Sequence, residues 1–171
     1  MSIEKVRESI EGAVAYLNRN PHEAQYTDTA ATAMIEDTLR CHAVASDGTA
    51  VKSDMPASVG GGGAAPSPGW LMRAALANCD ATLIAMRAAQ MGIELSDLEV
   101  IVDSESDDRG LLGMDDSVPA GPLSMRTRIR IAAKGASEED LREIIEWAEK
   151  HSPVADAIRR AVPMKTEVEF E

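Results

Sequence analysis

The chain has 171 residues, of which 44% are hydrophobic and 27% charged, a composition typical of one folded domain and unlike that of a disordered chain. Seventeen basic and 29 acidic residues give a net charge of −12. This charge repels nucleic-acid phosphates and anionic membrane surfaces, so neither is expected as a partner. Two cysteines cannot build a disulfide framework, and no segment matches a secretion signal or a membrane span, so a cytoplasmic protein is expected.

The first predicted element is an amphipathic helix over residues 3–17. Apolar residues recur there at helical spacing, at Ile3, Val6, Ile10, Val14 and Leu17. Asn20-Pro21 then ends the pattern. The apolar side of this helix is expected to cover another surface of the protein. We therefore divide the chain into an additional N-terminal helix, residues 1–21, and a main domain, residues 22–171.

A β-hairpin and an irregular loop are predicted next. Alternating polar and apolar residues over 34–45 predict a strand, and Ser46-Asp47-Gly48 is typical of a turn, so residues 49–53 are expected to return as a second strand. Residues 54–68 include four consecutive glycines. Because this run lacks the spacing of phosphate-binding loops, it predicts a flexible flap or a closely packed loop.

The longest predicted helix runs from Pro68 to about residue 91. Ser67 is a candidate N-cap, and Gly92 supplies the C-terminal stop. The helix is apolar on nearly every side, which is typical of a buried central helix. One sheet cannot enclose such a helix, so a partner subunit is expected. Its charged residues recur every seven positions on one narrow stripe, namely Arg73, Asp80 and Arg87.

Three later segments alternate as strands, at residues 98–104, 123–132 and 164–170. We predict that they form one sheet with its apolar face against the helices. On the other face, arginines of one strand are expected to pair with acids of its neighbour. The arginines are Arg126, Arg128 and Arg130, and the acids are Glu99, Asp103 and Glu105.

Two segments separate and follow these strands. The acidic segment 106–122 does not have the spacing of a calcium-binding EF-hand loop, so a surface loop or a lid over a site is expected. A helix is predicted from Ser137, with acidic residues in its first turn. It is interrupted at residues 151–154, and residues 156–162 predict a further helical turn or two.

Cys79 is the residue with nucleophile potential at the centre of the buried helix. A cysteine on an apolar helical face is most often a small core residue. A reactive thiolate at this mid-helix position would need a cation from another segment. Cys41 is interpreted as a strand core residue. His151 beside Ser152 offers a base and a hydroxyl, but without a third orienting group a hydrolase is disfavoured.

Several segments together resemble the OsmC/Ohr family of osmotically inducible and organic-hydroperoxide-resistance proteins. They are the hairpin, the glycine loop, Pro66-Ser67-Pro68, ALANCDAT (75–82) and SPVADAIRRAV (152–162). The resemblance covers about residues 35–171. It implies an α+β fold, an intertwined homodimer in which antiparallel sheets wrap long central helices. No cofactor or metal is expected.

The resemblance also implies roles for particular residues. Cys79 stands at the position of the family's peroxidatic cysteine, and Ser152 at that of the resolving cysteine, before Pro153. A hydroxyl cannot form a disulfide, so an external thiol, or Cys41, would have to complete the cycle. Gly69 stands where family members carry a glutamate. The cation that accompanies the cysteine in the family has two candidates here, Arg40 and Lys52.

Two functions are therefore expected as alternatives. The first is a redox and stress-response protein, a thiol-dependent organic hydroperoxide reductase with Cys79 as its one active-site cysteine and an external thiol as reductant. The second is a catalytically inactive homodimer that binds an apolar small molecule at the subunit interface.

Overall fold

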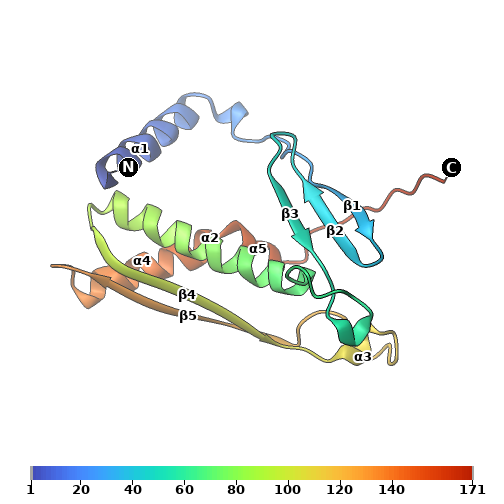
Figure 1. Ribbon diagram of the computed structural model, residues 1–171. Coiled ribbons are helices and arrows are strands. Elements are labelled where there is room, and N and C mark those ends of the chain that lie inside the picture. Colours follow the sequence, from blue (N-terminus) through green and yellow to red (C-terminus); the bar gives the residue numbers. More distant parts are fainter. Residues whose placement is uncertain (1, 171) are drawn as a thin grey trace.

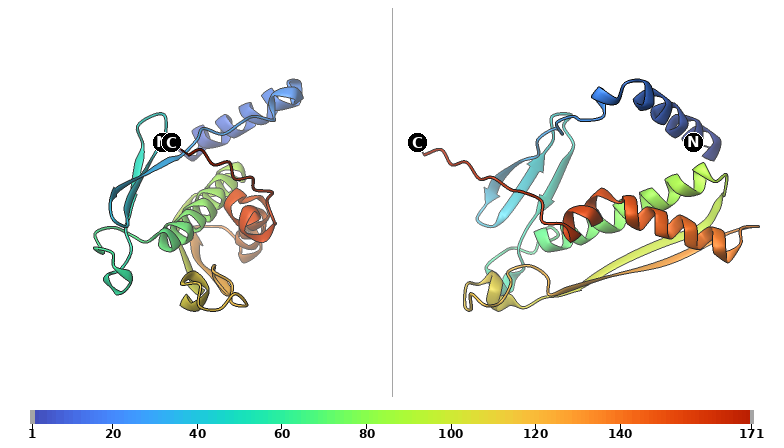
Figure 2. Two further views of the ribbon diagram at one scale, coloured as in Figure 1. Left: turned by 90° about the vertical axis from the view of Figure 1, so that its right-hand side faces the viewer. Right: turned by 180° about the vertical axis from the view of Figure 1, so that it is seen from behind.

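The computed structural model describes residues 2–170 and has a mixed α+β architecture (Figure 1). Its elements in chain order are α1 (Ile3–Arg19), β1 (Thr32–Asp37), β2 (Arg40–Val44), β3 (Ala50–Ser53), α2 (Pro68–Gln90), β4 (Leu95–Glu105), α3 (Asp108–Leu111), β5 (Ser124–Ala133), α4 (Glu138–His151) and α5 (Pro153–Arg159). Helices α2 and α4 cover one face of the ribbon formed by β4 and β5 (Figure 2). The strands β1–β3 stand apart from this layer (Figure 1).

The N-terminal helix forms as predicted. The Ser2 hydroxyl caps it by accepting a hydrogen bond from the Lys5 N–H, and the helix ends at Asn20. It packs against α2, yet none of its residues is buried, and Val14 and Leu17 keep exposed side chains. The division of the chain at residue 21 stays a prediction.

The predicted strand over residues 34–45 is wrong, because the chain reverses within it. Residues 38 and 39 form a turn between β1 and β2, with Thr38 at a φ of 45°. The two strands pair antiparallel, from Thr32 opposite Val44 to Asp37 opposite Arg40. A two-residue turn does not shift the parity of an alternating pattern, so the sequence carries no break there. The one predicted hairpin, with its turn at residues 46–48, is confirmed as the pairing of β2 with β3.

The predicted sheet of the later strands is confirmed in part. β4 and β5 pair antiparallel, as expected for residues 98–104 and 123–132, but the third expected strand does not join them. β1, β2 and β3 form a separate sheet, the N-terminal sheet. The predicted ion pairs of the second sheet are confirmed: Asp103 contacts Arg126 and Arg128, each at 3.0 Å, and Arg130 contacts Glu99 at 3.4 Å. Glu105 accepts a hydrogen bond from the Ser124 hydroxyl instead.

The predicted strand over residues 164–170 does not form. This segment has no regular structure and extends away from the rest of the chain (Figure 2). Met164 and Phe170 are each 93% exposed. A strand needs a neighbouring edge to accept its backbone hydrogen bonds, and no strand of the described chain pairs with this segment.

The core lies between α2, α4 and the β4–β5 sheet. Its fully buried members are Ile84 and Ala88 from α2 and Ile144 and Ala148 from α4. Apolar side chains of both strands pack against them, including Val100 and Ile129. Ser137 caps α4 in a capping box with Asp140, as its sequence predicts. One side of α2 stays open, so the expected enclosure of this helix is not completed within one chain.

Candidate functional site

Cys79 and Ser152 lie side by side, although 73 residues separate them in the sequence. Cys79 is half-buried in the middle of α2, and Ser152 is buried at the junction of α4 and α5. The Ser152 hydroxyl donates a hydrogen bond to Cys79 Sγ over 3.3 Å. The fold thus brings together the two positions that the sequence singles out.

Local backbone rules place Ser152 at this point. Pro153 has no N–H and cannot continue α4, so the helix ends at His151. Ser152 then adopts an extended conformation and starts α5, where its Oγ accepts a hydrogen bond from the Ala155 N–H at 3.3 Å. The Ser152 hydroxyl therefore accepts a hydrogen bond from the Ala155 N–H and donates one to the Cys79 thiol. These two bonds fix the orientation of the hydroxyl.

The two candidate cations do not lie beside Cys79 within one chain. Lys52 contacts Glu36 at 2.9 Å, and Arg40 contacts the same carboxylate at 3.3 Å. The pKa of Glu36 is lowered, mainly because Lys52 donates a hydrogen bond to its carboxylate. Both cations belong to the N-terminal sheet, which makes no extensive contact with α2. Within one chain both cations therefore pair with Glu36 and not with the thiol.

Cys41 lies in the same N-terminal sheet. It stands on β2, opposite Ile35 of β1 and Ser53 of β3. Both cysteines are free thiols in the structure. Cys41 therefore lies on a strand, as interpreted, but it is only half-buried and does not belong to the core.

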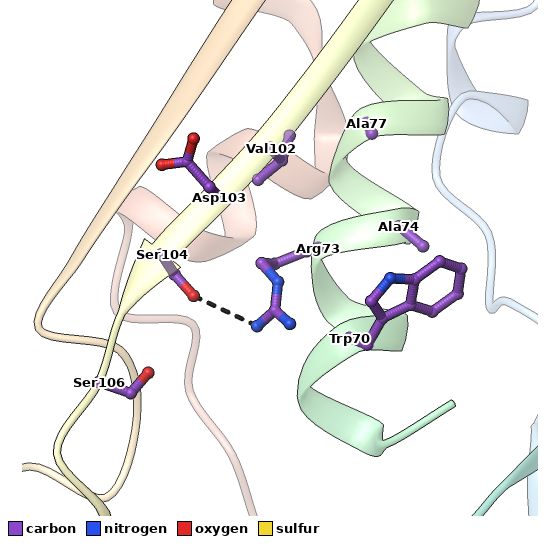
Figure 3. Close-up of a pocket in the computed structure, with 8 residues that line it drawn as sticks. All are labelled: Trp70, Arg73, Ala74, Ala77, Val102, Asp103, Ser104 and Ser106. Atoms are coloured by element: carbon purple, nitrogen blue, oxygen red, sulfur yellow. Dashed lines mark hydrogen bonds between the residues drawn. The ribbon is translucent and has the colours of Figure 1, made fainter. Parts of the chain in front are cut away.

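Sequence reasoning missed Arg73, a cavity-lining cation on the same helix as Cys79. Its guanidinium points from α2 toward β4 and donates to the Ser104 hydroxyl over 3.2 Å, with Trp70 beside it (Figure 3). Arg73 lines two cavities of about 530 and 540 Å³, the second of which reaches the acidic segment 106–122. A Cβ added at Gly69 would lie 3.9 Å from Arg73 Nη1. Residues four apart are neighbours on a helix surface, so the spacing of Gly69 and Arg73 could have predicted that Arg73 lies beside Gly69.

The other members of the seven-residue stripe have different surroundings. Arg87 forms an ion pair with Glu143 and lies over the ring of Trp147, 5.4 Å from its centre. Asp80 is buried, and its Oδ1 has no hydrogen-bond partner among the described residues. The three residues of the stripe therefore differ in their contacts. Arg73 donates to a hydroxyl, Arg87 lies over an aromatic ring, and Asp80 Oδ1 has no donor.

The loop that contains the glycine run packs closely at Asp54 and Gly61, as one of the two predicted alternatives expects. Asp54 is only 2% exposed and accepts hydrogen bonds from the N–H groups of Met55, Gly62 and Ala64. These bonds, that from Ala64 first, lower the pKa of Asp54. A Cβ at Gly61 would lie 1.9 Å from the Met55 carbonyl oxygen, so only glycine fits there.

Comparison with known proteins identifies the family. A sequence profile described as OsmC-like protein matches residues 60–167. The chain belongs to the OsmC-like protein family. This confirms the resemblance drawn from the sequence, while no curated protein matches the chain.

Solved structures of OsmC and related proteins share the fold. A putative osmotic stress induced and detoxification response protein from Psychrobacter arcticus matches with a TM-score of 0.62 and 20% identity, over 78% of this chain and 90% of that one. An organic hydroperoxide resistance protein from Legionella pneumophila matches with a TM-score of 0.56 and 23% identity, over 80% of this chain and 91% of that one. An OsmC-like protein from Mycoplasma pneumoniae matches with a TM-score of 0.66 and 15% identity, over 79% of this chain and 89% of that one. The α+β fold of this OsmC-like chain is therefore established.

Within residues 2–170, no helix has the length and apolar character needed to cross a membrane.

Proposed function

We propose that this OsmC-like protein is a thiol-dependent reductase of organic hydroperoxides that acts through Cys79. The hydrogen bond between Ser152 and Cys79 Sγ is the observation that carries the proposal, because it joins the two positions of the family's redox pair. The similar proteins from Legionella pneumophila and Elizabethkingia anophelis are organic hydroperoxide resistance proteins, which supports the same substrate class.

The first step oxidises Cys79. Its thiolate attacks the terminal oxygen of a hydroperoxide, so that an S–O bond forms and the O–O bond breaks. The sulfur becomes a sulfenic acid, and the departing alkoxide takes up a proton and leaves as an alcohol. The Ser152 hydroxyl donates a hydrogen bond to the sulfur and thereby orients the Cys79 side chain.

External thiols then reduce the sulfenic acid, because Ser152 has no sulfur to contribute. A first thiol attacks the Cys79 sulfur, releasing water and leaving a mixed disulfide. A second thiol attacks that disulfide, restoring Cys79 and releasing the oxidised reductant. One hydroperoxide and two thiols are thus converted into one alcohol, one disulfide and one water.

A homodimer completes the site in this proposal. Apolar side chains are exposed on the N-terminal sheet, including Ile35 and Val51, and α2 has an open side. Pairing these surfaces between two copies would bury both and would bring the partner subunit's Arg40 toward the central helix. A guanidinium near the sulfur would stabilise the thiolate and the departing oxygen.

Stopped-flow consumption of cumene hydroperoxide with excess dithiothreitol tests the proposal. Cys79→Ser is expected to reduce the rate to that of the uncatalysed reaction, while the matched variant Cys41→Ser keeps the wild-type rate. Ser152→Cys is expected to form an intramolecular disulfide with Cys79 after peroxide treatment, detected by intact mass, since the two side chains already touch. Equal rates for the wild type and Cys79→Ser would contradict the proposal.

A second candidate function is binding of an apolar small molecule without catalysis. The cavity of about 540 Å³ favours it, because Val59, Met72 and Leu111 give this cavity an apolar lining. If this function is correct, an apolar fluorescent dye binds the wild type and Cys79→Ser equally, and neither protein consumes peroxide faster than buffer. Met72→Trp, which narrows the cavity, is expected to weaken dye binding.

A further inference from the structure

A smaller cavity lies between α2, β5 and α5, and Cys79 does not line it. Its volume is about 260 Å³. Leu76, Met125 and Ile158 give it an apolar wall. The remaining lining is polar and includes Asp80 and Thr127.

Asp80 is the unusual member of this lining. Its side chain is on the buried side of α2, the residue is 5% exposed, and no described residue donates a hydrogen bond to its Oδ1. A carboxylate withdrawn from water without a donor is unfavourable. The cavity beside it therefore needs a hydrogen-bond donor, and preferably a cationic one.

The nearby arginine does not fill this need. Arg159 lines the same cavity, but its Nη1 donates to the backbone carbonyl oxygen of Glu149 over 2.8 Å. Among the described residues, Arg159 donates no hydrogen bond to Asp80 Oδ1. With Glu149 also in the lining, the cavity has two acidic residues and one basic residue around it.

We infer that this cavity binds a small protonated primary amine, with its ammonium group on Asp80. An ammonium group has three donors, and Asp80, the Thr127 hydroxyl and Glu149 are the acceptors around the cavity. A water molecule occupies about 30 Å³ of liquid, so the cavity can hold an alkylammonium ion of a few carbons. The apolar wall suits the alkyl part of such an ion.

A metal ion fits this lining less well than an amine. Among residues 2–170, no group of three or more histidine, cysteine, aspartate or glutamate side chains is arranged to bind a metal. The walls come from α2, β5, α4 and α5, which belong to one packed layer of a single chain. The site therefore requires neither a second copy nor the proposed chemistry of Cys79.

Titration of ¹⁵N-labelled protein with propylammonium chloride at constant ionic strength tests the inference. Backbone resonances of the cavity lining are expected to shift and to saturate, while 1-propanol, the neutral analogue, produces no saturable shift. Asp80→Asn is expected to weaken binding by about tenfold or more, the contribution of a hydrogen bond to a charged group. Asp116→Asn removes the same charge from the exposed acidic segment and is expected to leave the affinity unchanged.

A second variant keeps the inference testable if Asp80→Asn does not fold. Ile158 is exposed at the rim of the cavity, so Ile158→Trp can fill the space without removing the carboxylate. This variant is also expected to lose saturable binding. Absence of saturable binding to the wild type, an equal response to propanol, or full affinity in folded Asp80→Asn would each overturn the inference.

Discussion

The helical layer, formed by α2, α4 and α5, and the N-terminal sheet, formed by β1–β3, have similar apolar patterns in sequence. Only in the helical layer are the apolar side chains buried. Every buried apolar residue in the described chain belongs to α2, α4 or α5. In the N-terminal sheet, by contrast, Ile35 is 72% exposed and Met34 and Val51 are also exposed. The helical layer finds its covering surfaces within the chain, whereas the N-terminal sheet does not. An apolar pattern thus indicates which face must be covered, but not by what.

The largest expected effect comes from the centre of the helical layer. Ile144 is fully buried against Ile84, so Ile144→Ala should lower the free energy of unfolding by about 2–5 kcal/mol. Ile35→Ala removes the same atoms from the exposed sheet and should cost less than about 0.5 kcal/mol in a single chain. Urea unfolding of both variants at low protein concentration measures the difference. Equal losses would break the contrast between the two regions.

The next effect concerns association of two copies. If the N-terminal sheet is covered in the proposed homodimer, Ile35→Glu should raise the dissociation constant at least about tenfold, which corresponds to about 1.4 kcal/mol. Analytical ultracentrifugation should give twice the chain mass of 18.2 kDa for the wild type and a monomer at low concentration for the variant. A wild type that sediments as a monomer would contradict the homodimer.

A pH-dependent effect is expected at the junction of the two regions. The pKa of Asp54 is lowered in the folded chain by N–H groups of the glycine loop. Its contribution to stability is therefore complete above the unfolded value of about 3.9 and is lost as the pH falls through the folded pKa. Asp54→Asn should melt at a lower temperature than the wild type at neutral pH, and the difference should vanish in acid.

Thermal melts of the wild type, Asp54→Asn and Asp116→Asn over this pH range provide the measurement. The exposed control Asp116→Asn should follow the wild type. A difference between Asp54→Asn and the wild type that persists unchanged in strong acid would show that the carboxylate charge is not what organises the loop.

The smallest effect is expected on the outer face of the β4–β5 sheet. Arg126→Gln removes one partner of Asp103, but Arg128 remains 3.0 Å from the same carboxylate. Exposed ion pairs of this kind contribute about 0–1 kcal/mol and are screened by salt. Urea unfolding at low and high salt should show a small loss that disappears in high salt. A loss as large as that of Ile144→Ala would mean that this face is covered.

Local patterns predicted the parts of the fold that depend on near neighbours in sequence. The caps at Ser67 and Ser137 formed as expected. The turn at residues 38–39 was missed because it preserves the alternation of polar and apolar residues. The strand expected over residues 164–170 failed because alternation cannot supply a neighbouring edge.

The candidate site divides in the same way. The positions of Cys79 and Ser152 could be selected from sequence motifs, but their 3.3 Å contact depends on how α5 folds back on α2. Arg73 and Asp80 lie on the same stripe of α2, but their surroundings differ. The Arg73 guanidinium donates to the Ser104 hydroxyl, whereas the Asp80 side chain is buried and its Oδ1 has no hydrogen-bond donor. Helical periodicity determines a direction around the helix axis and not what lies in that direction.

By itself the sequence determined the long helices, their caps and the strands β3, β4 and β5, because each depends on short-range backbone and side-chain preferences. Its motifs also determined the family to which the chain belongs. Only the tertiary structure decided which strands share a sheet, that Ser152 touches Cys79, and that Asp80 is enclosed without a donor. These features depend on contacts between segments distant in sequence, and such contacts are set by the packing of whole elements rather than by any local pattern.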